Sequence, residues 1–367
     1  MRQKQGETGS FAMKEFDYVT AGSVLLTPRT VGLLTAIGEA KGRLSVQAEV
    51  RPDALRTLVE VARIQSTSAS NRIEGIATSD KRLNALVAEK VAPRNRDEEG
   101  IAGYRDVLTA IHDNHDYIPL TSNVILQLHR DLFRHTPLAF GGRFKDGDNV
   151  IVERDAQGNK RVRFAPPSAL ITPELVDRAC KACNEAIRGG AINPLLATFM
   201  FIFDFTCIHP FNDGNGRMSR LLTLLLLYRN GYDVGKYISI EHLIEQSKES
   251  YYEALAASTR GWLDNANDYG PFVDYMLGIV LAAYRELDDR FAGLMGGPVR
   301  VLGRLTKEQR IAALLERTLR PVSKADVLNE QPDVSVSTVE RTLKGLLDDG
   351  KIEKLGAGRG TRYVWKR

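Results

Sequence analysis

Hydrophobic residues recur at helical spacing along most of the chain, which predicts a mainly α-helical protein. A helix is expected from residue 53 onward, because its apolar positions share one helical face: Leu55, Leu58, Val59 and Ala62. The same spacing predicts further helices near residues 101–115, 122–134, 173–189, 194–207, 240–259 and 269–293. The chain therefore reads as a helical bundle with several buried helices.

One segment interrupts the helical pattern. The segments Asn149-Val-Ile-Val-Glu-Arg and Lys160-Arg-Val-Arg-Phe164 stand on either side of the polar turn 155–159. This arrangement predicts a β-hairpin in an otherwise helical region.

The pattern changes again after Gly296-Gly-Pro298, which reads as a linker. Helices are expected at residues 306–319, 323–329 and 335–349, and strands at 351–355 and 361–365 around a glycine-rich turn at 356–360. Three helices followed by two strands predict a winged helix-turn-helix domain.

The C-terminal region is the basic part of the chain. From residue 300 onward 15 Lys and Arg face 9 Asp and Glu, a balance of +6, whereas the whole chain carries +4. Residues expected on the exposed side of the third helix and on the wing give candidate DNA contacts: Ser337, Thr338, Arg341, Lys344 and Arg359. DNA binding is one interpretation. A protein-interaction or dimerisation domain is the other, because a fold does not fix a function.

Composition narrows the class of protein. Hydrophobic residues make up 43% of the 367 residues, enough for buried cores. The longest apolar runs are too short to cross a bilayer, and no signal segment opens the chain, so we expect a cytoplasmic protein without a membrane partner. The three cysteines give no complete disulfide framework, and Cys180 and Cys183 are expected to pack in a helix rather than to bind zinc.

The densest chemistry lies in His209-Pro-Phe-Asn-Asp-Gly-Asn-Gly-Arg-Met-Ser-Arg220, between two apolar segments. Gly214 and Gly216 permit the backbone to approach an anion closely, and the helix that follows points its positive end at the same place. This stretch predicts a cradle for the phosphates of a polyphosphate.

Three further groups complete that site. Asp213 offers a hard oxygen ligand suited to Mg²⁺. Arg217 and Arg220 lie three residues apart on one helical face and can each bind phosphate oxygens. The ring of His209 can take a proton from an incoming hydroxyl.

The stretch resembles the signature of Fic proteins, in which His-Pro-Phe is followed by an acidic residue, Gly-Asn-Gly and two arginines. The resemblance implies a Fic helical bundle and transfer of AMP from ATP to a Tyr, Thr or Ser hydroxyl of a target protein, or of the enzyme itself. It implies His209 as the base, Asp213 as the Mg²⁺ ligand, and a set of nucleotide-binding residues: Gly214, Asn215, Gly216, Arg217 and Arg220. The related death-on-curing kinases carry lysine where this chain has Gly216, which favours adenylylation over phosphorylation.

A second segment is similar to the inhibitory motif of that family. Ser70 is followed four residues later by Glu74 and then by Gly75, at the end of the helix expected from residue 53. The resemblance implies that Glu74 pairs with Arg220 and keeps it from the γ-phosphate. Inhibition would then be intramolecular.

The predicted hairpin stands where Fic proteins carry a flap over the active site. The resemblance implies that the flap residues Val150, Ile151 and Val152 dock an extended segment of the target by main-chain hydrogen bonds. The preceding Gly142-Arg143-Phe144-Lys145 resembles the short element before the flap, with lysine where arginine is more usual.

These observations divide the chain into four parts: an N-terminal region of short helices with the inhibitory helix (1–100, ending in the charged run 94–99), a Fic core (101–230), a helical extension (231–298) and a winged helix-turn-helix domain (299–367).

Two functions remain open. The first is an auto-inhibited protein adenylyltransferase that uses ATP and Mg²⁺. The second is a DNA-binding transcriptional regulator in which the Fic core is a nucleotide sensor or dimerisation unit. Many Fic proteins are dimers, so the resemblance favours a homodimer.

Overall fold

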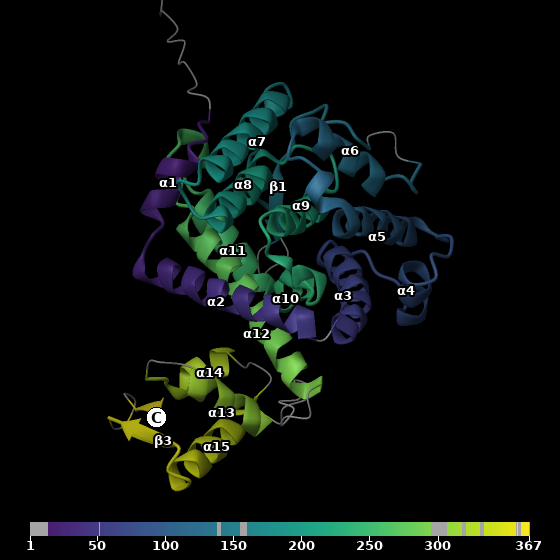
Figure 1. The fold of residues 1–367 in the computed structure, drawn as a ribbon. Helices are drawn as coiled ribbons and strands as arrows, with labels where there is room; N and C mark the ends of the chain where they lie inside the picture. Colours follow the sequence, from purple (N-terminus) through teal and green to yellow (C-terminus); the bar gives the residue numbers. More distant parts are fainter. Residues whose placement is uncertain are drawn as a thin grey trace, which may run out of the picture. The chain divides into compact units, whose positions relative to one another are not determined.

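The computed structural model describes residues 14–50, 52–137, 141–154, 160–294, 307–317, 321–330, 334–356, 358 and 361–366. The chain forms two compact units, residues 1–291 and 292–367. The prediction of a mainly helical protein is confirmed (Figure 1). No described helix is both long enough and apolar enough to cross a membrane.

The first unit is built from helices joined by short connections. Its helices are α1 (Tyr18–Val24), α2 (Pro28–Val50), α3 (Pro52–Ile73), α4 (Asp80–Val87), α5 (Arg96–Asn114), α6 (Ser122–Leu132), α7 (Thr172–Gly189), α8 (Pro194–Ile208), α9 (Asn215–Arg229), α10 (Ile240–Gln246), α11 (Lys248–Thr259) and α12 (Gly270–Leu294), with 3₁₀ turns η1 (His115–Tyr117), η2 (Asp233–Lys236) and η3 (Trp262–Asp264).

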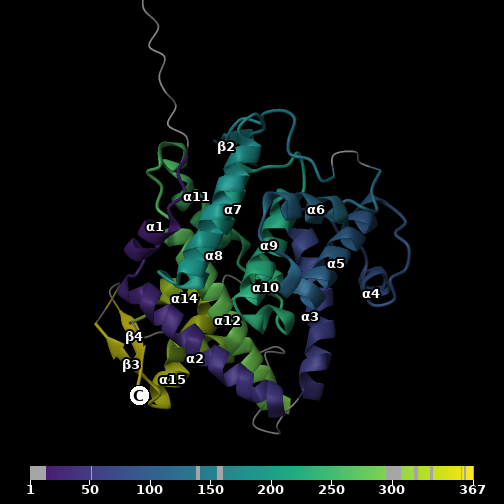
Figure 2. The same cartoon turned by 45° about the horizontal axis from the view of Figure 1, so that its top comes forward.

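Helices α8 and α9 form the centre of this unit. Nearly every residue of both is buried, and α7, α5 and α3 pack around them (Figure 2). Asn193 caps α8 by accepting a hydrogen bond from the Leu195 N–H, and Pro194 occupies its first turn, so its start is well defined. Because both helices are buried, they anchor the two ends of the loop between them.

The N-terminal region differs from the prediction of short helices. Helices α2 and α3 have 23 and 22 residues. The charged run 94–99 is also not the end of a region but the start of α5. Asn95 accepts a hydrogen bond from the Glu98 N–H, and three acidic residues stand in the first turn, where the positive end of the helix dipole favours them.

The single helix predicted near residues 240–259 is interrupted at Ser247. Its backbone leaves the helical region there, its hydroxyl donates to the Leu243 carbonyl, and the same oxygen bonds the Tyr275 hydroxyl. A serine that bonds the backbone of the preceding turn competes with the helix, and a tertiary partner reinforces the break here. The chain therefore forms α10 and α11 in place of one helix.

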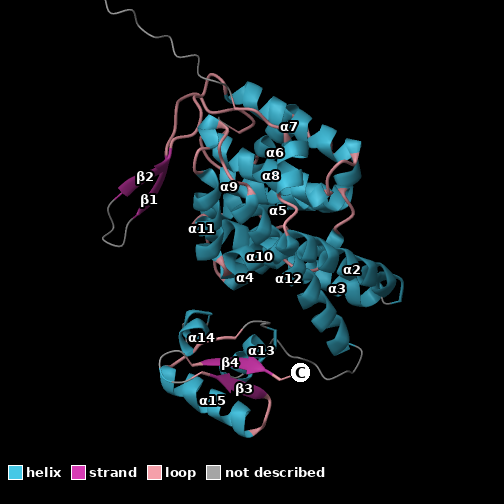
Figure 3. Ribbon diagram, turned by 90° about the vertical axis from the view of Figure 1, so that its left-hand side faces the viewer, coloured by secondary structure: helices cyan, strands magenta, loops and turns pink. Residues whose placement is uncertain are grey.

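Strands β1 (Ile151–Arg154) and β2 (Lys160–Phe164) pair antiparallel, with an irregularity between Ile151 and Val152. Figure 3 shows the pair standing to one side of the helices. The turn predicted at 155–159 lies outside the described residues.

The second unit has its own core. It contains α13 (Lys307–Arg317), α14 (Lys324–Glu330) and α15 (Val336–Asp348), followed by the antiparallel strands β3 (Ile352–Leu355) and β4 (Arg362–Trp365). Val322 extends this sheet by bridging to Tyr363. The buried residues that pack between helices and strands include Ile311, Val339, Leu343 and Tyr363. The linker at 296–298 lies outside the described residues.

Candidate active site

The loop between α8 and α9 is held in one shape by hydrogen bonds. His209 ends α8 in the left-handed region (φ 49°), a strained conformation for a residue other than glycine. Asn215 closes the loop: its amide donates to the Phe211 carbonyl at 2.8 Å, and its Oδ1 accepts from the Phe211 N–H at 2.9 Å. Strain retained at a tightly bonded loop is typical of a functional site.

The two glycines of the loop have different reasons to be glycine. Gly214 has a positive φ (84°), and a Cβ there would stand 2.9 Å from the Phe133 ring. Gly216 lies in the first turn of α9, and a Cβ there would overlap the Glu74 carboxylate oxygen Oε1. The Glu74 carboxylate therefore lies directly against the first turn of α9, where the predicted phosphate cradle is.

Arg220 is the residue that meets Glu74. Its Nη2 donates to Glu74 Oε1 and to the Ser70 carbonyl, both at 2.8 Å, and its Nε donates to the Ser70 hydroxyl at 2.7 Å. The Arg220 side chain is 3% exposed and that of Glu74 is 35% exposed. The structure thus brings Arg220 to Ser70 and Glu74, which lie 150 and 146 residues before it in the sequence. Gly75 ends this segment in the left-handed region (φ 79°).

The pair changes the ionisation of both groups. Burial by itself would raise the pKa of the Glu74 carboxyl, but the charge and the hydrogen bond of Arg220 outweigh it, so this pKa lies below its ordinary value. Burial likewise opposes the charge of Arg220, and Glu74 restores it, raising the pKa of the guanidinium. Both groups are charged at neutral pH.

Arg217 and Asp213 lie on the other side of the loop. The Arg217 side chain is buried over the Phe133 ring, 5.0 Å from its centroid, and its Nη2 is 3.9 Å from Asp213 Oδ1. Within the described part of the chain, Arg217 Nε has no hydrogen-bond partner. Asp213 is exposed, and its Oδ1 accepts from the Gly214 N–H at 2.6 Å. No described group of three or more His, Cys, Asp or Glu side chains could hold a metal ion by itself.

Two cavities flank Glu74. The larger, about 500 Å³, has walls from the loop, the hairpin and α11: Glu74, Ile151, Arg163, Thr206, His209, Asn215, Gly216, Ser219, Arg220, Lys248, Tyr251, Tyr252 and Leu255. The smaller, about 310 Å³, is lined by Asp213, Arg217 and Arg96, among others. Glu74 lines both cavities, the larger together with His209 and the smaller together with Asp213.

His209 is neutral in this environment. Burial, assisted by the positive charge of Lys145, lowers its pKa to about 4. A neutral imidazole can accept a proton at physiological pH, as a general base must.

Sequence reasoning overlooked His129, which supports the loop from α6. Its ring stacks on Phe211 at 3.7 Å between centroids, accepts from the Gly142 N–H at Nδ1, and bonds the Asp213 carbonyl through Nε2 at 3.0 Å. Because Nδ1 is an acceptor, the proton sits on Nε2. A histidine in an amphipathic helix, next to Leu128 and Arg130, gives no local signal of such a role.

The role of Lys145 was also not predicted. Its buried ammonium donates to the Ile208 carbonyl at 3.2 Å and to Asn149 Oδ1 at 3.1 Å, while its N–H donates to the Pro210 carbonyl. The residues of the cavity wall on α11 were overlooked as well, because no local pattern in the sequence links them to the loop.

The predicted docking strand is partly described. Val150 is 55% exposed, Ile151 lines the larger cavity, and Val152 belongs to β1 with a side chain outside the described part. The hairpin is therefore present beside the cavity that contains His209. Its role as a flap stays a prediction.

The predicted DNA contacts lie on the second unit. Ser337 and Lys344 are exposed on α15, and Thr338 is half-buried beside the hydroxyl of the capping residue Ser335. Arg341 is exposed but paired with Glu308 at 2.9 Å. Arg359 lies outside the described residues. The charge of Arg341 is thus partly neutralised by Glu308.

Comparison with known proteins agrees with this geometry. Residues 119–227 match the model of the Fic/DOC family. A protein named protein adenylyltransferase Fic, from Nematostella vectensis, is 23% identical over 253 residues, which are 66% of this chain and 53% of that protein. The chain thus spans about half the length of this relative.

Two solved structures share the fold. A Fic family protein from Desulfovibrio desulfuricans superposes with a TM-score of 0.60 at 26% identity, covering 93% of this chain and 97% of that one. A Fic domain containing signaling protein from Bacteroides thetaiotaomicron gives 0.59 at 21% identity, covering 75% and 100%, and shows the fold alone. The chain carries a Fic domain and has homologues among the Fic adenylyltransferases.

Proposed function

We propose that this protein is an adenylyltransferase that transfers AMP from ATP to a hydroxyl side chain of a target protein, and that α3 holds it inactive. One observation carries the proposal. Arg220, a candidate phosphate ligand, is bound instead to Glu74, and the Glu74 carboxylate lies against Gly216 in the cradle. A carboxylate at this place repels the phosphate oxygens that the cradle would otherwise bind.

The reaction requires a base that takes the hydroxyl proton, N–H groups that bind the phosphates, and positive groups that stabilise the phosphate charge. The neutral His209 takes the proton of the acceptor hydroxyl, whose oxygen forms a bond to the α-phosphorus of ATP. The bond from that phosphorus to the oxygen bridging the α- and β-phosphates breaks, and pyrophosphate leaves. Backbone N–H groups of the first turn of α9 and the guanidinium of Arg217 stabilise the charge on the phosphates.

Asp213 fits a metal that arrives with its substrate. Mg²⁺ commonly binds through one or two carboxylates plus phosphate oxygens, and Asp213 is an exposed carboxylate beside the cradle. When bound, Mg²⁺ would neutralise charge on the leaving pyrophosphate.

A charge deletion tests the proposal. Glu74→Gly frees Arg220 for the γ-phosphate, so protein labelling should rise about tenfold or more, because alignment of reacting atoms is worth several kcal/mol. Label should transfer from ATP labelled at the α-phosphate and not from ATP labelled at the γ-phosphate, which separates adenylylation from phosphorylation.

Two variants control for nonspecific loosening of α3. Glu245→Gly removes another ion pair of this helix, the 2.6 Å contact with Arg72, without touching Arg220, and should give no gain. Adding Arg220→Ala to Glu74→Gly should abolish the gain. Equal labelling by the parent and Glu74→Gly would mean that residues 70–75 are an ordinary helix end.

A further inference from the structure

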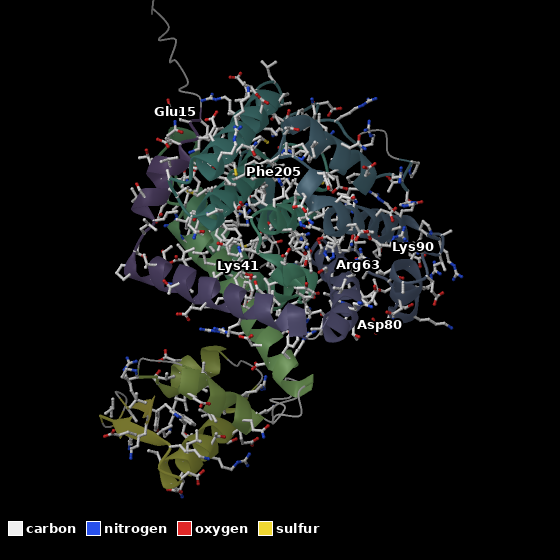
Figure 4. The ribbon with its side chains drawn as sticks, in the orientation of Figure 1. Glu15, Lys41, Arg63, Asp80, Lys90 and Phe205 are labelled. Carbon is white, nitrogen blue, oxygen red and sulfur yellow. The ribbon has the colours of Figure 1, made fainter. Side chains whose placement is uncertain are left out.

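A third cavity lies away from the loop, between α3, α4 and α5. It has a volume of about 210 Å³, and its walls include Arg63, Thr67, Lys90 and Arg105. Figure 4 labels Arg63 and Lys90, which lie on the same side of the first unit. Nothing in the proposed reaction uses this cavity.

The wall is cationic. Three of its side chains carry a positive charge, Arg63, Lys90 and Arg105, against one acidic side chain, Glu60. Arg63 pairs with Asp113, and Arg105 pairs with Asp106, but neither acid lines the cavity. A guanidinium that uses one edge for a carboxylate still presents other N–H donors.

Two buried donors in this wall are unused. Thr67 is fully buried, and its hydroxyl has no hydrogen-bond partner among the described residues. The Nε atom of Arg63 is also buried and has no such partner. Leaving such groups unpaired costs free energy, so a bound acceptor would stabilise the folded chain.

Lys90 adds a third observation. It is one of three described residues other than glycine with a positive φ (53°), along with His209 in the catalytic loop. Strained backbone of this kind clusters at ligand sites.

We propose that this cavity binds a phosphate group, as inorganic phosphate or as the end of a small phosphate ester. The wall supplies a hydroxyl, an Arg Nε–H and an ammonium, which are the donors that phosphate oxygens accept from. A cavity of about 210 Å³ leaves room for the anion and a small substituent.

The site is connected to the inhibitory segment through α3. Thr67 and Ser70 lie three residues apart on one face of this helix, and Glu74 follows directly after its last residue, Ile73. A phosphate bound at Thr67 would stabilise α3 in the position that keeps Glu74 on Arg220. This regulatory consequence rests on the proposed function, whereas the binding itself does not.

Calorimetric titration of the full chain with inorganic phosphate and with ribose 5-phosphate tests the binding directly. The parent is compared with three variants. Thr67→Val/Lys90→Gln removes two donors from the cavity wall, and Arg217→Ala weakens the phosphate cradle of the loop. Lys81→Gln changes an exposed lysine of α4 outside the cavity and serves as the control. The Thr67→Val change keeps the shape and removes a hydroxyl that has no partner in the described structure, so the unliganded variant should melt no lower than the parent.

We expect binding to weaken at least about tenfold in Thr67→Val/Lys90→Gln and to persist in Arg217→Ala and Lys81→Gln. Phosphate should also raise the melting temperature of the parent and not that of the double variant. Binding of both ligands shows that the site accepts esters, and binding of phosphate alone shows that it takes the free anion. Binding that is lost in Arg217→Ala and unchanged in Thr67→Val/Lys90→Gln belongs to the cradle and overturns the proposal, as does the absence of any binding. Because no transfer is measured, an inactive protein would not affect the outcome.

Discussion

Two arginine–glutamate pairs of similar length occupy very different positions in this protein. Arg220 and Glu74 meet at 2.8 Å with the arginine 3% exposed, whereas Arg341 and Glu308 meet at 2.9 Å on the second unit with side chains 73% and 45% exposed. Burial makes the first pair costly to break, because an unpaired charge would remain in a low-dielectric site. The second pair is screened by water and contributes little. An arginine–glutamate ion pair therefore indicates a functional site where it is buried, in the first unit, and an ordinary surface contact where it is exposed, in the second.

The largest effect is expected at the base. In a Glu74→Gly background, His209→Ala should lower protein labelling by on the order of a hundred- to ten-thousandfold, because the acceptor hydroxyl loses its proton acceptor. Arg341→Ala in the same background should leave labelling unchanged. Labelling is followed with ATP carrying label at the α-phosphate. An equally fast His209→Ala variant would remove this histidine from the mechanism.

Asp213 belongs to the candidate active site but, unlike the buried Arg220, it is exposed. Asp213→Ala should lower transfer at saturating ATP by on the order of a hundredfold, since charge stabilisation by a metal is worth several kcal/mol. The dependence of the rate on Mg²⁺ concentration should weaken with it. If both the rate and its Mg²⁺ dependence match the parent, the carboxylate has no part in metal binding.

The two arginines should differ in stability. Arg220→Ala leaves Glu74 and Ser70 without their partner and should cost roughly 3 kcal/mol of unfolding free energy, whereas Arg341→Ala should cost less than about 1 kcal/mol. The two tryptophans of the chain lie one in each unit, Trp262 and Trp365. Denaturation followed by fluorescence in a Trp365→Phe background therefore reports the first unit, and the difference from the parent curve reports the second. Similar losses for both arginines would show that burial does not separate them.

The smallest effect concerns pH. His209 acts in its neutral form and its pKa is lowered to about 4 in the parent, where Glu74 raises it. Labelling by the Glu74→Gly variant should therefore stay constant near neutrality and fall only below about pH 4. Lys145→Met removes a buried positive charge that helps to keep this pKa low, so the acid limb should move to higher pH. Lys145→Arg keeps the charge and should restore the parent profile, and Arg341→Gln should have no effect. An acid limb that does not move in Lys145→Met would show that burial alone sets the pKa.

Sequence alone determined the parts of this protein that are local. The stretch 209–220 is contiguous, so glycine geometry, the start of α9 and the arginine spacing could all be read from adjacent residues, and the buried helices around it followed from their apolar runs. The partner of Arg220 was inferred from the resemblance of residues 70–75 to the inhibitory motif of Fic proteins, and the structure brings Ser70 and Glu74 to Arg220.

Tertiary structure decided what depends on contacts between distant segments. The run 94–99 starts a helix through its own capping and acidic residues, whereas the packing of α5 on α3 and α9 depends on contacts between distant segments. Ser247 breaks a helical pattern where its hydroxyl also meets Tyr275, and the support of the loop by His129 and Lys145 arises where α6 and the segment before β1 pack against it. A local pattern specifies backbone preference, but the partner of a polar side chain is fixed only when helices far apart in the sequence bury it together.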